Sequence, residues 1–304
     1  MSVTVVILAF NEARHIARVL RSVAAIADSV VVVDSGSTDR TVEIARAMGA
    51  EVLTNSFVNQ AQQFNWALEQ LSSGTDWVLR VDADEVVSSA LASEINARLP
   101  ALPDDVVGLT LPRHMAFLGQ PIRHGGVFPA HVLRLFRFGR GRSEERWMDE
   151  HIAVEGRVEM LEGELLDDNL NPLGWWIDKH NRYASREALQ VLLEERRSGG
   201  AASTAVMGRQ ATTKRWIKRT VYGRMPAGLR AVAYFLYRYL LRGGFRDGYP
   251  GLVFHVLQGF WYRFLVDAKL FEARRHLLHH DDDLAATSRD VLGIHLAGTA
   301  ECDK

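Results

Sequence analysis

The first hundred residues alternate between short apolar runs and segments in which apolar residues recur every three or four positions. Continuous apolar runs predict buried strands, and the three- and four-residue spacing predicts amphipathic helices. We expect strands at 3–8, 30–33, 52–53 and 77–81, with helices at 16–26, 41–48, 60–71 and 88–98. Strands that alternate with helices over short connections predict an α/β fold with a parallel sheet and right-handed crossovers.

Polar residues follow three of these strands, at the point where each strand ends. They occupy residues 9–12, 34–39 and 82–85. Ligands of open parallel sheets bind outside the carboxyl ends of the strands, so we expect the three segments to form one site. Asp34 is suited to accept a hydrogen bond from a base or a ribose hydroxyl, and Gly36 permits a tight turn. A simple helix-capping loop is the alternative interpretation of residues 34–39.

Asp82 and Asp84 are spaced two residues apart at the end of the fourth strand. Alternate side chains of a strand share one face, so these carboxylates would converge while Ala83 faces away. Carboxylate oxygens suit Mg²⁺ or Mn²⁺, which commonly share their coordination shell with substrate phosphates. The pattern favours a divalent metal site, with a plain polar turn as the alternative.

The composition is that of an ordinary globular protein, with 304 residues, 47% hydrophobic and 24% charged. The one cysteine, Cys302, excludes a disulfide framework and a cysteine-based metal site. The apolar run at 3–10 has no basic segment before it and ends at Asn11, so we expect no signal peptide and a cytoplasmic active site.

Four segments carry a specific resemblance: "TVVILAFNE", "VVVDSGSTDRT", "NWALE" and "VLRVDADE". Residues 1 to about 155 resemble the family 2 inverting glycosyltransferases, whose GT-A fold is a Rossmann-like, mostly parallel sheet with flanking helices. The resemblance implies a nucleotide diphosphate sugar donor, most often UDP-linked, and assigns the base to Asp34 and the metal to Asp84. The predicted donor site comprises Ala9, Asn11, Glu12, Asp34, Gly36, Ser37, Asp39, Asp82, Ala83 and Arg134.

One departure from the family pattern concerns the "NWALE" segment. Relatives often carry Lys or Arg immediately before its asparagine, whereas Phe64 precedes Asn65 here. Gln63 and Asn65 are therefore open to two interpretations, donor binding or packing of a core helix.

Residues 117–156 combine glycine pairs, prolines, basic and aromatic residues, which is typical of loops and short strands around an acceptor pocket. An inverting transfer needs a carboxylate to take the acceptor proton. By resemblance to a subgroup of the family, Glu150 is the predicted base, with Asp149 as the alternative. His151 would orient the carboxylate, contact phosphate or make a structural hydrogen bond. That subgroup comprises lipopolysaccharide core glucosyltransferases and related envelope enzymes, which implies a glycan or glycolipid acceptor; the similarity continues to about Glu272.

Residues 196–246 contain twelve Arg and Lys and no Asp or Glu, interleaved with Trp and Tyr. This suits an anionic membrane surface or a phosphorylated glycolipid, and without a nucleic-acid motif we expect no nucleic acid partner. A solvated basic face is the alternative. The uncharged stretch 248–262 is shorter than the about 20 residues of a membrane span. We therefore expect peripheral attachment at the cytoplasmic face of the inner membrane, or a core role for the apolar residues of 252–260.

The expected organisation has four parts: a catalytic domain at 1–172, a helical extension at 173–197, a basic and aromatic helical region at 198–280 and a solvated polar tail at 281–304. Two other functions remain open. A metal-dependent nucleotidyltransferase also needs paired acids, but no glycine-rich phosphate loop follows the first strand. A non-catalytic glycan- or membrane-docking protein could retain the same fold.

Overall fold

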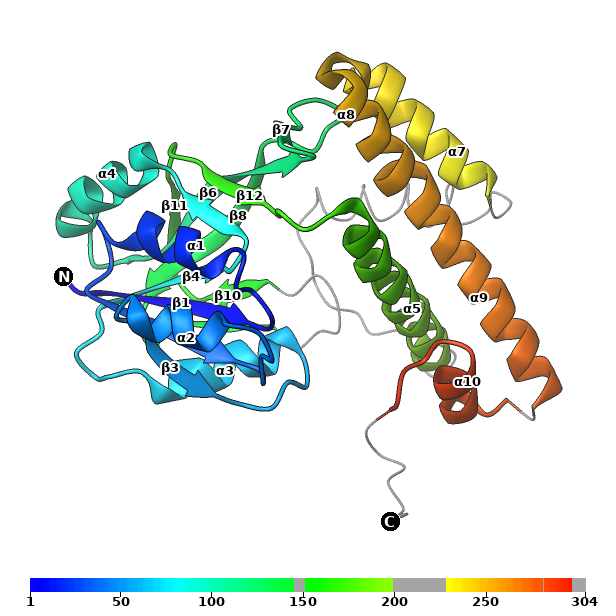
Figure 1. Cartoon of the computed structure of the whole chain (residues 1–304), viewed down its shortest axis with the longest axis horizontal. Coiled ribbons are helices and arrows are strands. Elements are labelled where there is room, and N and C mark those ends of the chain that lie inside the picture. Colours follow the sequence, from blue (N-terminus) through cyan, green and yellow to red (C-terminus); the bar gives the residue numbers. More distant parts are fainter. Residues whose placement is uncertain (145–150, 199–227, 281, 297–304) are drawn as a thin grey trace, which may run out of the picture. The chain divides into compact units, whose positions relative to one another are not determined.

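The computed structural model describes residues 1–144, 151–198, 228–280 and 282–296. The chain divides into two compact units, residues 1–171 and 172–304, each with its own hydrophobic core (Figure 1). Each unit is described separately below.

Unit 1 begins with the predicted alternation of strands and helices. Four parallel strands lie in the order β3-β2-β1-β4. Their bounds are β1 Val3–Ala9, β2 Ser29–Asp34, β3 Glu51–Thr54 and β4 Trp77–Asp82. The helices are α1 Ile16–Val23, α2 Thr41–Ala47, α3 Gln60–Gln70 and α4 Ser89–Arg98, the last followed by the 3-10 turn η1 Leu99–Ala101. The predicted α/β fold is confirmed.

Beyond β4 the sheet becomes mixed. Strand β8 is antiparallel to both β4 and β6, after which come β12, parallel to β6, and β5, antiparallel to β12. Their bounds are β5 Glu85–Val87, β6 Val106–Phe117, β8 Ala130–Arg137 and β12 Leu165–Asp168. Strands β7 Gln120–Pro121 and β11 Arg157–Met160 also pair with β6, and β9 Gly141–Ser143 pairs with β10 Ile152–Val154.

This topology brings a late segment of unit 1 to the end of β4. Only Ala83 and Asp84 separate β4 from β5, yet β5 pairs with β12. Residue Asp167 therefore lies opposite Glu85 in the register. The chain that follows β12 reaches the polar turn at the end of β4.

Side chains alternate between the two faces of the central strands, as strand geometry requires. On one face Val5 and Ile7 pack with Ile16 and Val19 of α1. On the other face Val6 packs with residues of α3. Helices thus pack on both faces of these central strands in the described part of unit 1.

Unit 2 is helical in the described residues. Its elements are α5 Leu173–Ser198, α7 Leu229–Leu236, the π-helical η3 Tyr237–Leu241, the 3-10 helix η4 Gly244–Asp247, α8 Gly248–Phe254, the π-helical η5 His255–Trp261, α9 Tyr262–His279 and α10 Leu284–Asp290. Helices α5 and α9 pack through Ala184, Ala188, Val266 and Leu270. No helix of the described part is long and apolar enough to cross a membrane.

The predicted polar tail is wrong for the segment around α10. The Asp283 side chain accepts a hydrogen bond from the Ala286 N–H and caps this helix. Leu284 and Leu292 are buried in the core of unit 2. The charged residues at 281–283 favoured a solvated tail, whereas the short helix is held by its Asp283 cap and by packing against α9, which the sequence alone does not show.

Candidate active site

Hydrogen bonds connect the loop that follows β1 to the loop that follows β2. The Asn11 N–H donates to Ser37 Oγ at 2.8 Å, and Asn11 Oδ1 accepts from the Thr38 N–H at 2.8 Å. The Ala13 N–H donates to Asp39 Oδ2 at 3.0 Å. Asn11 has a φ of 57°, a left-handed conformation that asparagine tolerates. The predicted residues Asn11, Ser37 and Asp39 are therefore brought together, with polar atoms engaged in shaping the loops.

Asp34 ends β2 and is buried. Its Oδ2 accepts from the N–H groups of Gly36 and Ser37, each at 2.9 Å, and Gly36 adopts a φ of 90° to close this turn. Its Oδ1 is buried and has no hydrogen-bond partner among the described residues. An unpaired buried carboxylate oxygen is costly, so this atom is suited to accept a donor group from a ligand. Ala9, the last residue of β1, lies beside it and is buried as well.

Gln63 and Asn65 have structural partners, which favours packing over donor binding. The Gln63 amide donates to Ser35 Oγ at 3.1 Å. Asn65 holds the backbone of Ser143 through two hydrogen bonds, of 3.0 and 2.9 Å. Phe64 between them is fully buried. Asn65 thereby attaches α3 to strand β9.

The predicted catalytic residues Asp149 and Glu150 lie outside the described residues. The segment that contains them is preceded by β9 and followed by β10, which pair with each other. The Glu144 N–H donates to the backbone oxygen of His151 at 2.9 Å, and His151 is exposed. The hairpin anchored by Asn65 thus carries both ends of this segment.

An arginine joins the half-buried carboxylate of Asp82, at the end of β4, to the buried carboxylate of Glu85, at the start of β5. Arg134 Nη2 donates to Asp82 Oδ2 at 2.7 Å and to Glu85 Oε1 at 2.9 Å. The Asp82 N–H donates to Glu85 Oε2 at 2.8 Å, and Glu85 is 1% exposed. Arg134 was predicted to bind the donor, and here its guanidinium is engaged with the acidic turn. Ala83 next to Asp82 is buried.

Burial and the surrounding charges separate the pKa values of these two carboxylates. Burial opposes ionisation of Asp82, but the guanidinium groups of Arg134 and Arg80 lower its pKa well below the usual value. Burial raises the pKa of Glu85 to about 8; Arg134 opposes this rise, and the neighbouring Asp82 carboxylate adds to it. Asp82 is therefore the charged partner of Arg134 at neutral pH.

The raised pKa of Glu85 predicts a pH-dependent stability. Between the unfolded value of 4.5 and the folded value of about 8, the folded protein holds a proton that the unfolded chain lacks. The free energy of unfolding therefore falls as the pH rises through this window. Glu85→Gln mimics the protonated acid and is expected to flatten that slope in urea titrations from about pH 5 to about pH 9. Parallel slopes for the two proteins would contradict this assignment.

Asp84 lies in a turn and not in a strand. Strand β4 ends at Asp82, so the expected alternation of side chains does not extend to Asp84, because the chain reverses toward β5. Asp84 Oδ2 accepts from Asn169 Nδ2 at 2.9 Å, and its backbone oxygen accepts from the Asp168 N–H at 3.1 Å. Its Oδ1 has no hydrogen-bond partner in the described part of the chain.

This arrangement fits a divalent cation that the substrate helps to hold. The described residues contain no group of three or more acidic, histidine or cysteine residues that could enclose a metal. Mg²⁺ is often bound through one or two carboxylates together with substrate phosphates. Asp84 would supply the protein oxygen, whereas Asp82 is engaged with Arg134.

The segment after β12 belongs to the site and was missed in the sequence. Buried His15 accepts the Leu170 N–H at Nε2, at 2.9 Å, so its Nδ1 carries the proton and donates to Glu12 Oε2 at 2.5 Å. Arg18 Nη1 donates to Asp168 Oδ2 at 2.6 Å. These contacts connect residues about 150 positions apart. The acidic run 167–168 after two leucines was the only available signal.

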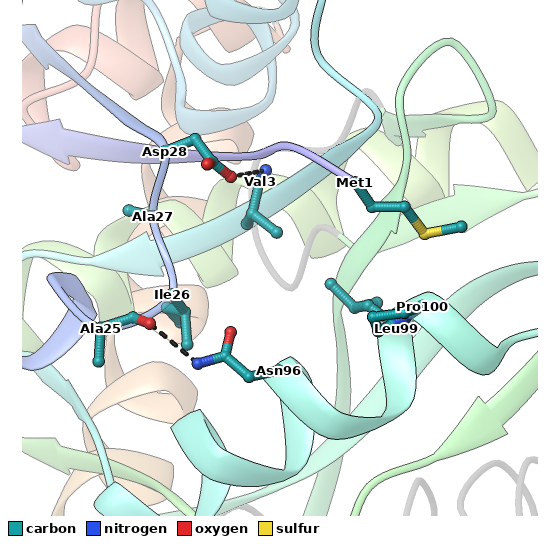
Figure 2. Close-up of a pocket in the computed structure, with 9 residues that line it drawn as sticks. All are labelled: Met1, Val3, Ala25, Ile26, Ala27, Asp28, Asn96, Leu99 and Pro100. Carbon is teal, nitrogen blue, oxygen red and sulfur yellow. Dashed lines mark hydrogen bonds between the residues drawn. The ribbon is translucent and has the colours of Figure 1, made fainter.

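A cavity of about 210 Å³ lies elsewhere in unit 1. It is lined by residues around the amino ends of β1 and β2, the opposite edge from the candidate site. Figure 2 shows that Asp28 accepts the Val3 N–H and that Asn96 donates to the Ala25 oxygen, at 2.7 and 2.9 Å. Its polar side chains thus hold local backbone, which points to a structural role.

Comparison with known proteins identifies the first unit. A family model described as Glycosyl transferase family 2 matches residues 4–154. An uncharacterized glycosyltransferase of Rickettsia bellii is 44% identical over 89 residues, which are 29% of this chain and 30% of that protein. The lipopolysaccharide core biosynthesis glycosyltransferase LpsC of Rhizobium meliloti is 27% identical over 283 residues, 90% of this chain and 92% of its own.

Solved structures give a partial match. Glucosyl-3-phosphoglycerate synthase of Mycobacterium tuberculosis, solved with Mn²⁺, UDP and glucosyl-3-phosphoglycerate, has a TM-score of 0.32 and 23% identity. The match covers 37% of this chain and 44% of that one. The family model, together with the relative that spans most of both chains, supports the resemblance seen in the motifs. Residues 4–154 of this chain form a domain of glycosyl transferase family 2.

Proposed function

We propose that this protein is an inverting glycosyltransferase that moves a sugar from a nucleotide diphosphate sugar, such as UDP-glucose, to a cell-envelope glycan or glycolipid. The observation that carries the proposal is a pair of carboxylate oxygens, Asp34 Oδ1 and Asp84 Oδ1, that accept no hydrogen bond from the described residues. Asp34 ends β2 and Asp84 lies in the turn after β4, and these two strands flank β1. Two strand spacings separate β2 from β4 by about 10 Å. This span is comparable to that from the base to the diphosphate of a nucleotide diphosphate.

In the proposed reaction the acceptor hydroxyl oxygen attacks the anomeric carbon of the donor sugar. The bond from that carbon to the diphosphate oxygen breaks, its electron pair leaves with the nucleotide diphosphate, and the hydroxyl proton passes to Glu150. A single displacement inverts the configuration. Mg²⁺ or Mn²⁺, when bound, neutralises charge on the leaving diphosphate. Asp84 would hold the cation, and Asp34 would accept from the base.

The acceptor side of the proposal rests on a relative and on charge. LpsC of Rhizobium meliloti, which aligns with 90% of this chain, is named for lipopolysaccharide core biosynthesis. The region 196–246 contains twelve basic and no acidic residues, which suits a phosphorylated glycolipid. We infer that the enzyme acts at the cytoplasmic face of the inner membrane as a peripheral protein.

Calorimetric titration with UDP, GDP, dTDP and CDP sugars, with and without Mn²⁺ or Mg²⁺, tests the donor half. We expect one nucleotide sugar to bind, and only when the metal is present. Binding of nucleoside triphosphates without any sugar nucleotide would instead support nucleotidyl transfer. A protein that binds neither class would contradict both catalytic proposals and leave a docking role.

The base is tested by Glu150→Gln. We expect transfer to slow by at least about a hundredfold, because the acceptor proton loses its acceptor group. The dissociation constant of the donor should stay unchanged, since the base contacts the acceptor. Asp149→Asn is the matched control. A large loss in Asp149→Asn with normal transfer in Glu150→Gln would reassign the base to Asp149.

A further inference from the structure

The turn formed by residues 236–249 of unit 2 exposes apolar side chains and buries a charged one. This turn runs from the end of α7 through η3 and η4 into α8 (Figure 1). Leu241 is 80% exposed and Tyr249 is 74% exposed, with Leu240 and Phe245 more than half exposed. Arg238, in the same π-helical segment as Leu241, is buried. Apolar side chains thus face outward while a guanidinium faces inward.

Two polar side chains, those of Arg238 and His255, are buried among aromatic rings beneath this turn. His255 is fully buried, and neither ring nitrogen has a hydrogen-bond partner among the described residues. The guanidinium of Arg238 lies 5.4 Å from the ring centre of Tyr234 and 5.9 Å from that of Phe254. Arginine and histidine side chains usually lie at surfaces that contact water. Their burial beneath exposed apolar side chains is therefore unfavourable when the turn faces water. An apolar environment outside the turn would account for it.

Exposed basic and aromatic residues border the apolar ones. Arg242 and Arg246 are exposed and have no ion-pair partner in the described part of the chain. No acidic residue occurs between 196 and 246, and Asp247 is the one acid within the turn. Leucine and phenylalanine beside tyrosine and arginine are typical of protein segments that lie at a lipid headgroup boundary.

Two observations decide between a bilayer surface and a second copy of the chain. The turn 236–249 is shorter than the about 20 residues that a bilayer span needs, so it would lie in the bilayer interface. Two copies that met through this turn would bring their arginines into one interface with only Asp247 as a counter-charge. Complementary charge therefore favours an anionic lipid surface.

We propose that the 236–249 turn is a docking surface for an anionic lipid bilayer. Leu241, Phe245 and Tyr249 enter the boundary between headgroups and acyl chains, while Arg242 and Arg246 contact lipid phosphates. This proposal rests on the proposed function, which places the acceptor at a membrane. It adds the surface through which the enzyme would bind that membrane. Docking itself requires neither donor nor acceptor.

Vesicle sedimentation with the full chain tests the proposal. The probes are vesicles of phosphatidylethanolamine with phosphatidylglycerol, and vesicles of phosphatidylcholine alone. We expect binding to the first kind, and a partition coefficient lowered at least about tenfold by the double variant Leu241→Ser with Tyr249→Ser. The variant Arg242→Gln with Arg246→Gln should lose the preference for anionic vesicles. Phe271→Ser with Leu278→Ser, 68% and 85% exposed on α9, is the control and should bind normally.

Equal losses in the control and the turn variant would overturn the assignment to this turn, and so would unchanged binding of the turn variant. Sedimentation equilibrium without lipid tests the other candidate partner of this turn, a second copy of the chain. A dimer that the turn variant converts to monomer, without vesicle binding by the wild type, would identify the turn as a subunit interface and overturn the proposal. Nucleotide-sugar binding measured without lipid separates these results from a failure of the transferase proposal, since turn variants should retain it.

Discussion

Asp84→Ala is expected to lower the rate of sugar transfer by about a thousandfold and to abolish metal-dependent donor binding. Asp84, in the turn after β4, offers a carboxylate oxygen that accepts no hydrogen bond from the described residues, whereas Asp82 accepts a hydrogen bond from Arg134. Without Asp84 the proposed cation would lose its protein ligand, and the charge on the leaving diphosphate would no longer be neutralised. Transfer kinetics and calorimetry with Mn²⁺ measure the two effects.

Asp84→Asn separates metal binding from folding. Asparagine keeps an oxygen that can accept from Asn169, so the local turn should persist. The asparagine variant should therefore unfold at nearly the wild-type urea concentration, and both variants should lose metal-dependent binding. Normal transfer by either folded variant, or transfer that proceeds equally well in a chelator, would remove Asp84 from its assigned role.

Arg134→Met is expected to cost about 3–5 kcal/mol in the free energy of unfolding. Methionine fills similar volume but leaves Asp82 and Glu85 without the guanidinium that joins them. Both carboxylates lie where burial penalises their ionised forms. The loss should be largest at neutral pH, where Asp82 is ionised, and urea denaturation measures it.

Arg40→Met is the matched control for this effect. Arg40 pairs with Glu43 on the surface, and their side chains are 73% and 64% exposed. Its replacement should change the free energy of unfolding far less than Arg134→Met does, as is usual for exposed ion pairs. Adding Asp82→Asn to Arg134→Met should recover part of the stability, because the charge that has lost its nearest guanidinium partner disappears. If Arg134→Met lowers the free energy of unfolding no more than the control does, Arg134 does not stabilise the fold by joining Asp82 and Glu85.

Local patterns carried enough information for the elements of β1 to α4. Val3, Val5 and Ile7 belong to an apolar run that predicts a buried strand, and all three are buried. Ile16, Val19 and Val23 recur at the three- and four-residue spacing of a helix. Beyond β4 the strands pair with partners distant in sequence, such as β12 with β5. No local spacing encodes which distant strand is the partner, so the mixed half of the sheet could not be predicted.

By itself, the sequence determined that Asp34, Asp82 and Asp84 each follow a buried strand, because apolar runs and the acids after them are neighbours along the chain. Only the tertiary structure decided how these acids differ. It joined Asp82 to Arg134 of β8, and it brought Asn169 of the segment after β12 to Asp84. It also turned Leu241 outward and Arg238 inward. The physical reason is that hydrogen bonding and burial depend on which distant segments meet, and sheet pairing and helix packing set those meetings.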